Sequence, residues 1–241
     1  MINIIKVKNN DEASDKAFEL MKEYLQPGKV LGLATGSTPL GLYARMIRDH
    51  EENGTSYLDI KTFNLDEYVG LEITHPESYY AFMHRNLFDH IDIREENVHI
   101  PCGLGDDLEE KAREYDEMID QDPVDIQILG IGSDGHIAFN EPGTPFDSPT
   151  HITDLAESTI RDNCRFFDND ISKVPTQAVT QGIGTIMKAK NIILIATGAN
   201  KARAVRDMIE GEVDEACPAS ILQRHPNVYA IIDEAAASLL S

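Results

Sequence analysis

The sequence predicts an α/β protein built on a parallel β-sheet. Short β-branched apolar runs alternate with longer amphipathic stretches along the whole chain, which is the pattern of βα units. With 241 residues, 41% of them hydrophobic and 26% charged, the chain has the composition of an ordinary globular protein and enough length for a substantial core. Residues 1–241 contain no repeat, low-complexity tract or linker, so we expect a single domain.

The expected elements follow one another in order along the chain. The predicted strands are Asn3–Val7, Lys29–Ala34, Ile60–Asn64, Val98–Pro101, Asp125–Ile131, Asn191–Thr197 and Asn227–Ile232. The predicted helices are Glu12–Gln26, Pro39–Glu52, Ser78–His90, Leu108–Gln121, Thr176–Ala189 and Ala199–Glu210. Ser133 to Pro175 shows neither pattern. Because long irregular segments in compact domains are usually binding loops or lids, we predict a lid at about residues 150–175, over the carboxyl ends of the strands.

Ligands in open parallel sheets bind beyond the carboxyl ends of the strands, and the first such end carries a candidate phosphate-binding turn. The run Leu31–Pro39 leads from a strand into small residues, with Thr38 as the expected N-cap and Pro39 at the first helical position. Backbone N–H groups and hydroxyls there would cradle a phosphate. A plain, well-capped βα turn is the alternative. The run lacks the Gly-Lys-Ser/Thr ending of a nucleotide P-loop.

The run Phe63–Gly70 places two acidic residues at the end of another strand. Neighbours in an extended segment point in opposite directions, so at most one of Asp66 and Glu67 should face a site. An Asp-Glu pair taken alone is more often a solvated acidic turn.

The run Leu129–Gly143 contains the Gly-x-Gly-x-x-Gly spacing of dinucleotide-binding proteins. That fingerprint needs a helix to open at its last glycine, whereas Pro142 and Gly143 would interrupt such a helix within two turns. We therefore reject a dinucleotide site.

The same run places one histidine between two carboxylates. Asp134 and Glu141 can orient the imidazole of His136 and stabilise its protonated form, which suits general acid/base chemistry. Two alternatives stay open: a core histidine satisfied by local hydrogen bonds, and a metal site in which Asp66 joins these three residues.

Charge and cysteine content restrict the partners and the compartment. A formal net charge of −21 disfavours nucleic acid and anionic membranes as partners. A phosphate ester would need local cations, for which Arg161, Arg165 and Lys201 are candidates. Three widely spaced cysteines argue against a disulfide framework, and the N-terminal apolar run is too short for a signal peptide or membrane span. We expect a cytoplasmic protein.

These motifs closely resemble the glucosamine-6-phosphate deaminase family, over nearly the whole chain. The matching runs are TGSTP at Thr35–Pro39, Asn64–Gly70, Gly132–Pro142 and CRFF at Cys164–Phe167. The resemblance implies a modified Rossmann-like parallel sheet flanked by helices, shared with ribose-5-phosphate isomerase and phosphogluconolactonase relatives. It also implies conversion of glucosamine 6-phosphate and water to fructose 6-phosphate and ammonium, without a cofactor, and we assign no metal.

Site roles follow from the resemblance position by position. Asp66 matches the base for enolisation, while Asp134, His136 and Glu141 match the ring-opening group. The residues that match the family's phosphate site are Gly36, Ser37, Thr38, Arg165 and Lys201. The chemistry needs such groups: an imidazole can shuttle protons between the anomeric hydroxyl and the ring oxygen, and one carboxylate can carry a proton from C2 to C1.

Two other functions remain as alternatives. A phosphogluconolactonase-like hydrolase would need a water-activating histidine but no enolisation base such as Asp66. A non-catalytic sugar-phosphate sensor domain could discard its acid/base residues and would usually carry a DNA-binding segment, and this chain shows neither departure.

Some members of the family are oligomers activated by N-acetylglucosamine 6-phosphate, bound through basic residues. The matching positions here are Thr144, His151 and Thr153, none of which carries a fixed positive charge. We therefore expect a monomer or small homo-oligomer with hyperbolic kinetics and no such activation.

Overall fold

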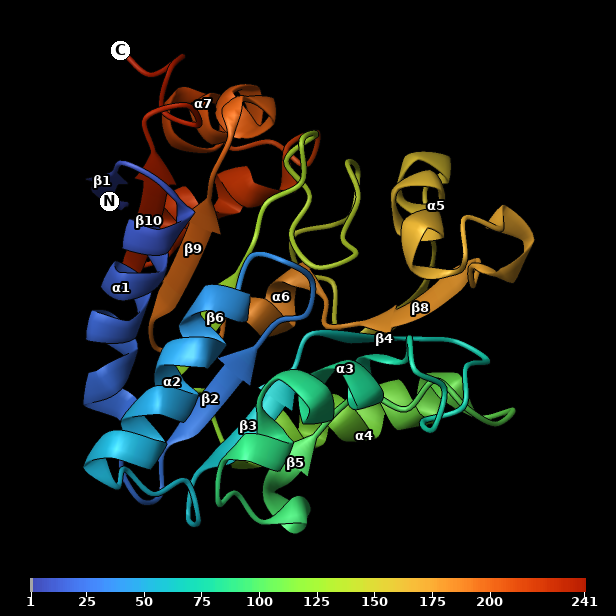
Figure 1. Ribbon diagram of the computed structural model, residues 1–241. Coiled ribbons are helices and arrows are strands. Elements are labelled where there is room, and N and C mark those ends of the chain that lie inside the picture. Colours follow the sequence, from blue (N-terminus) through green and yellow to red (C-terminus); the bar gives the residue numbers. More distant parts are fainter. Residues whose placement is uncertain (1) are drawn as a thin grey trace.

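The computed structural model describes residues 2–241, apart from the side chains of residues 158 and 162. It contains a seven-stranded parallel sheet with flanking helices and a smaller three-stranded antiparallel sheet (Figure 1). The large sheet is formed by β1 (Asn3–Val7), β2 (Val30–Leu33), β3 (Lys61–Asn64), β5 (Val98–His99), β6 (Ile126–Leu129), β9 (Ile192–Ala196) and β10 (Val228–Asp233). Each predicted strand is present, so the predicted α/β fold class is confirmed.

The order of the strands creates a crevice in the middle of the large sheet. The order is β1-β10-β9-β6-β2-β3-β5, and every neighbouring pair is parallel. The chain runs outward from β2 through β3 to β5, then returns to β6 on the other side of β2 and continues through β9 to β10. The loops after β2 and β6 therefore leave in opposite directions and open a crevice between these two strands. Open α/β sheets bind ligands in such a crevice.

Helices flank the two sheets, and those on the large sheet pack through stripes of apolar side chains. Their bounds are α1 (Asn10–Met21), α2 (Leu40–Asn53), α3 (Tyr79–Asn86), α4 (Leu108–Gln121), α5 (Glu157–Asn163), α6 (Ile183–Ile186) and α7 (Ala202–Glu210). Ala13, Ala17 and Met21 follow one another at four-residue spacing on α1 and are fully buried. Helices α1 and α2 lie together in front of the sheet in Figure 1.

The small sheet was not predicted. It consists of β4 (Asp66–Tyr68), β8 (Gln177–Thr180) and β7 (His151–Asp154), in the order β4-β8-β7. The prediction that residues 133–175 lack regular structure is therefore wrong for β7 and also for α5. Strand β8 pairs with β4 on one side and β7 on the other, so these long-range hydrogen bonds give the segment its structure.

The predicted helix over Thr176–Ala189 is also wrong. Strand β8 and the single turn α6 occupy these residues instead. Gly182 lies between the two elements, and Gly184 lies within α6. A Cβ atom on Gly182 would lie 2.1 Å from the carbonyl oxygen of Pro149, and one on Gly184 would lie 2.9 Å from that of Asp147. Glycine is required for this close approach and weakens a continuous helix.

Residues 150–175 share a second, smaller core with the small sheet. Its buried members are Tyr68, Phe139, Leu155, Phe167, Val174 and Ala178. Figure 1 shows α5 standing on β8, to one side of the large sheet. This placement is compatible with a lid, but whether the segment opens and closes stays a prediction, as does the single-domain assignment.

Two further findings concern the cysteines and the character of the helices. Cys102, Cys164 and Cys217 are free thiols, as their spacing predicted. Among residues 2–241, no helix combines the length and the apolar character needed to cross a membrane.

Candidate active site

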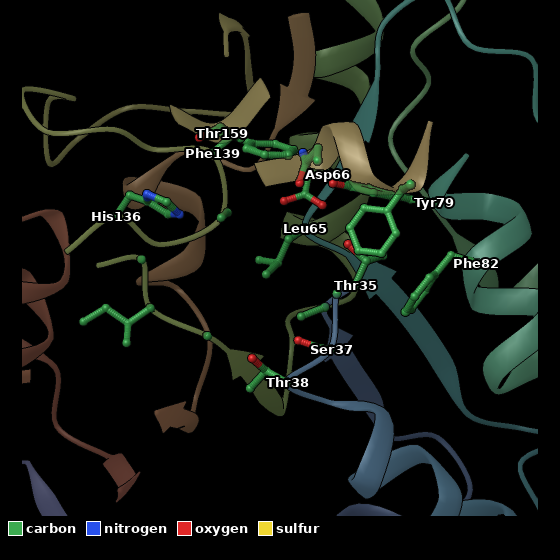
Figure 2. Close-up of a pocket in the computed structure, with 18 of the residues that line it drawn as sticks. Thr35, Ser37, Thr38, Leu65, Asp66, Tyr79, Phe82, His136, Phe139 and Thr159 are labelled. Atoms are coloured by element: carbon green, nitrogen blue, oxygen red, sulfur yellow. The ribbon is translucent and has the colours of Figure 1, made fainter. Parts of the chain in front are cut away.

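A cavity of about 350 Å³ opens at the carboxyl ends of the strands, at the crevice between β2 and β6 (Figure 2). The segments that follow β2, β3, β6 and β9 all contribute to its walls, so the cavity lies beyond the carboxyl ends of the strands, where the sequence analysis expected a ligand to bind. These segments supply Ser37, Asp66, His136 and Lys201, of which Asp66 is the first residue of β4. Thr159, Asn163 and residues 165–167 close another side. Its volume is in the range of small-molecule sites.

The turn after β2 presents hydroxyl groups to this cavity. Gly36 has a φ of +84°, in the left-handed region that favours glycine. Helix α2 begins at Leu40, with Pro39 as its N-cap and no side-chain capping bond, so the prediction of Thr38 as N-cap is wrong. Ser37 and Thr38 instead line the cavity wall (Figure 2). Their hydroxyls, with the N–H groups of the turn, can hold an anion such as phosphate.

Of the two adjacent acids, only Asp66 lines the cavity, as the extended backbone predicted. Both lie on β4, whose pairing with β8 sends their side chains in opposite directions. Glu67 is 3% exposed and accepts hydrogen bonds from the backbone N–H groups of Tyr68, Tyr79 and Tyr80, at 2.8, 2.9 and 2.9 Å. Its carboxylate thereby joins β4 to the start of α3.

The environment of Asp66 makes its carboxyl group unusually basic. The side chain is buried, and its carboxylate has no hydrogen-bond donor among the described side chains and backbone groups. Burial, followed by the nearby charge of Glu67, raises the pKa of Asp66 to about 8, although the positive charge of His136 acts in the opposite direction. A carboxylate with a pKa near the working pH can both take up and return a proton.

His136 lies between two carboxylates, as the sequence suggested. Its Nδ1 is 2.8 Å from Oδ1 of Asp134 and 3.5 Å from Oε2 of Glu141. These are ion-pair contacts, and neither has the angles of a well-formed hydrogen bond. A Cβ atom on Gly132 would lie 2.4 Å from Nδ1, so a glycine is required where the loop folds back over the imidazole. Asp134 and His136 line the cavity, whereas Glu141 lies behind His136 and does not line it.

The two carboxylates keep the imidazole protonated. Burial alone would lower the pKa of His136, but the interactions with Asp134 and Glu141 outweigh it and raise the pKa to about 9. The same contact with His136 holds the pKa of Asp134 below its usual range. At neutral pH the site therefore carries an imidazolium that can donate a proton to a ligand.

Two cationic residues complete the polar lining. Arg165 lies in a 3-10 turn after α5, with its guanidinium group 4.7 Å from the ring centre of Phe166. Lys201 ends the 3-10 turn that follows β9. Both line the cavity, as does the turn of Gly36, Ser37 and Thr38, so the structure brings the predicted phosphate-binding residues to one cavity. Arg161 instead contacts Glu157 on the surface, at 3.1 Å.

Several cavity residues were missed by the sequence analysis. Tyr79 and Phe82 come from α3, and their rings stand on the opposite side of the cavity from His136 in Figure 2. Thr159 and Asn163 come from α5. The Tyr-Tyr pair at the start of α3 was a visible signal, but nothing in the pattern around Thr159 distinguishes it from a surface threonine.

The metal-site alternative keeps some geometric support. Ligand atoms of Asp134, His136 and Glu141 lie within 4.8 Å of one another, and Asp66 is not part of this group. The carboxylates, however, stabilise the protonated form of the imidazole, and an imidazolium is not a metal ligand.

We therefore predict that activity survives exhaustive chelation. Acid/base chemistry assigns each proton transfer to a side chain and leaves no task for a metal ion. Turnover is measured before and after dialysis against EDTA. Loss of turnover that a single divalent ion restores would contradict the acid/base assignment.

Comparison with known proteins gives consistent matches over nearly the whole chain. Residues 10–230 match the family model described as glucosamine-6-phosphate isomerases/6-phosphogluconolactonase. The glucosamine-6-phosphate deaminase of Shouchella clausii is 52% identical over 241 residues, covering 99% of this chain and 97% of the relative. That of Halalkalibacterium halodurans is 50% identical over 238 residues, covering 98% and 96%.

Solved structures agree with these matches. A monomeric glucosamine-6-phosphate deaminase superposes with a TM-score of 0.95 at 44% identity, covering 99% of this chain and 100% of that one. A 6-phosphogluconolactonase from Trypanosoma brucei superposes with a TM-score of 0.77 at 22% identity, covering 100% and 99%, and shows a shared fold alone. The chain belongs to the glucosamine-6-phosphate isomerase/6-phosphogluconolactonase family.

Proposed function

We propose that this protein converts glucosamine 6-phosphate and water to fructose 6-phosphate and ammonium. The observation that carries the proposal is the pairing, in one cavity, of a buried carboxylate with raised pKa and a histidine held protonated by two other carboxylates. Relatives that are about half identical over nearly their whole length bear the name glucosamine-6-phosphate deaminase.

His136 is proposed to open the sugar ring. The imidazolium donates its proton to the ring oxygen, and the imidazole that results accepts the proton of the anomeric hydroxyl. The products are the open-chain aldehyde and a regenerated imidazolium. Because Nδ1 faces Asp134 and Glu141, Nε2 is the ring nitrogen left to face the substrate.

Asp66 is proposed to move the double bond. Its carboxylate removes the proton at C2, and the oxygen at C1 takes up a proton, which gives an enol. Return of the C2 proton to C1 and loss of one proton from the amino group leave an imine at C2, so the proton that the oxygen gains is balanced by the one that the nitrogen loses. Water adds to that imine, and expulsion of ammonia, which leaves as ammonium, gives the ketone of fructose 6-phosphate. Burial keeps the carboxylate basic enough for this carbon acid.

The lactonase alternative does not account for Asp66. Hydrolysis of a lactone requires an activated water but no proton transfer at carbon, so a buried, basic carboxylate in the same cavity as the histidine would have no task. A sensor domain would likewise have no use for either group. The test is to incubate the purified protein with glucosamine 6-phosphate and, separately, with 6-phosphogluconolactone. We expect equal amounts of ammonium and fructose 6-phosphate from the first, whereas hydrolysis of the lactone alone would refute the proposal.

Arg165 and Lys201 are proposed to bind the phosphate group, with the turn of Gly36, Ser37 and Thr38. Arg165→Ala and Lys201→Ala should each weaken binding by about 1.5–3 kcal/mol, the value of a charge-assisted hydrogen bond, and leave kcat less affected. Steady-state kinetics with glucosamine 6-phosphate and with glucosamine measure the preference for phosphate. A variant that retains the full preference of the wild type would exclude that residue from the phosphate site.

Regulation by N-acetylglucosamine 6-phosphate is not expected, and we propose that the protein acts as a monomer. The relative that superposes with a TM-score of 0.95 is a monomer. His151 Nδ1 lies 2.7 Å from the carbonyl oxygen of Pro149, and neither Thr144 nor Thr153 adds a charge for a second phosphate. Substrate titrations should be hyperbolic with and without the compound. A sigmoidal curve that becomes hyperbolic when N-acetylglucosamine 6-phosphate is added would show two coupled sites.

A further inference from the structure

We propose that Thr159 is a positioning residue for ring opening, because its hydroxyl group orients the carboxylate of Glu141 toward the imidazole of His136. The inference rests on the proposed function and extends it to a residue of the predicted lid segment. It concerns the geometry of the histidine and assigns Thr159 no proton transfer of its own.

The two oxygens of Glu141 have separate partners. Thr159 Oγ1 donates a hydrogen bond to Oε1 at 3.1 Å, while Oε2 lies 3.5 Å from Nδ1 of His136. The Glu141 side chain is only 20% exposed, so few water molecules can replace either partner. The hydroxyl therefore fixes the rotation of the carboxylate that faces the imidazolium.

The hydrogen bond connects two segments that are distant in the sequence. Thr159 lies in the first turn of α5, and its hydroxyl bonds a side chain 18 residues away, in the loop that carries His136. Thr159 also lines the cavity (Figure 2), so α5 reaches the acid/base group beside the space where a substrate would bind.

A second contact of α5 holds the helix in the position that this bond requires. Asn163 is four residues after Thr159 and thus on the same face of the helix. Its Nδ2 donates a 2.8 Å hydrogen bond to the hydroxyl group of Tyr68, which lies two residues beyond Asp66 on β4. Helix α5 is thereby attached to both halves of the site, the ring-opening group and the strand of the proposed base.

The decisive experiment compares Thr159→Val with Thr159→Ser. Valine keeps the branched shape and removes the donor, so we expect kcat for glucosamine 6-phosphate to fall roughly tenfold with KM within about twofold. Serine restores the donor and should return kcat to within about twofold of the wild type. Thr176→Val, at an exposed threonine outside the cavity, is the matched control and should leave both constants unchanged.

Two further measurements separate positioning from a general loss of structure. Affinity for 2-amino-2-deoxyglucitol 6-phosphate, an analogue that is already open-chain, should be the same for Thr159→Val and the wild type. In a background of Glu141→Gln, Thr159→Val should cause little additional loss, because both changes disturb the same contact.

Three results would overturn the proposal: wild-type kcat in Thr159→Val, a failure of serine to restore it, or a loss that is undiminished in the Glu141→Gln background. A rise in KM with unchanged kcat would instead mean that Thr159 binds substrate directly. The wild type is assayed in the same series. If it releases no ammonium, the proposed function has failed, whereas an active wild type with an equally active valine variant removes only the role of Thr159.

Discussion

Asp66→Asn is expected to lower kcat by at least about a hundredfold while KM changes by no more than a few-fold. The carboxylate is proposed to act on the proton at C2, so its loss raises the barrier of the chemical step and leaves ground-state contacts largely intact. The amide has the same shape but cannot accept that proton. Steady-state measurement of ammonium release gives both constants. A variant with more than about a tenth of the wild-type kcat would contradict the assignment.

The same substitution should raise the stability of the folded protein. The pKa of Asp66 is about 8 in the folded state against a usual value of 3.8, so below pH 3.8 the carboxyl group is protonated in both states and costs nothing. As the pH rises from there to 8, the unfolded chain ionises first and the wild type loses stability by about 1.4 kcal/mol per pH unit. Asparagine removes this loss. Thermal unfolding at pH 5 and pH 8 should show a gain for the variant that is larger at pH 8.

His136→Gln is expected to lower kcat/KM by roughly 10²–10⁴-fold, the usual contribution of a general acid/base group. Glutamine can still form hydrogen bonds but cannot donate and recover the proton that ring opening needs. Affinity for the open-chain analogue should change little, because that ligand does not need to be opened. A variant that loses affinity for the analogue in parallel with turnover would show that His136 mainly binds substrate.

The pH profile offers a second test of His136. For the wild type, kcat/KM should rise toward pH 8 as Asp66 ionises and fall beyond pH 9 as His136 loses its proton. The imidazolium lowers the pKa of Asp66, so in His136→Gln the rising limb should move to higher pH and the falling limb should disappear. A rising limb that stays in place would mean that the two groups do not interact.

The sequence predicted the parts of the structure that local patterns determine. Each strand of the large sheet was visible as a short apolar run, and the cavity lies beyond the carboxyl ends of the strands, as expected for an open parallel sheet. Asp66 could be separated from Glu67 because side chains alternate along extended backbone. Asp134, His136 and Glu141 lie within eight positions of one another, and their contacts required only a tight loop.

The parts that were missed depend on contacts between distant segments. Strand β8 pairs with β4 across more than a hundred residues, and this pairing overrides the helical pattern of the segment after Thr176. Thr159 contacts Glu141 only because α5 and the small sheet fold over the cavity. The spacing of residues in one chain carries no signal for such contacts.

The most direct test of the central claim follows a label at C2 of the substrate. Wild-type protein is incubated with glucosamine 6-phosphate deuterated at C2, and loss or transfer of that deuterium is followed beside ammonium release, in parallel with Asp66→Asn. The account predicts that the wild type removes the deuterium from C2 as it releases ammonium, and that the substitution slows both processes together, by at least about a hundredfold. A variant that removes the label at the wild-type rate, or a wild type that releases ammonium with the deuterium still on C2, would contradict it.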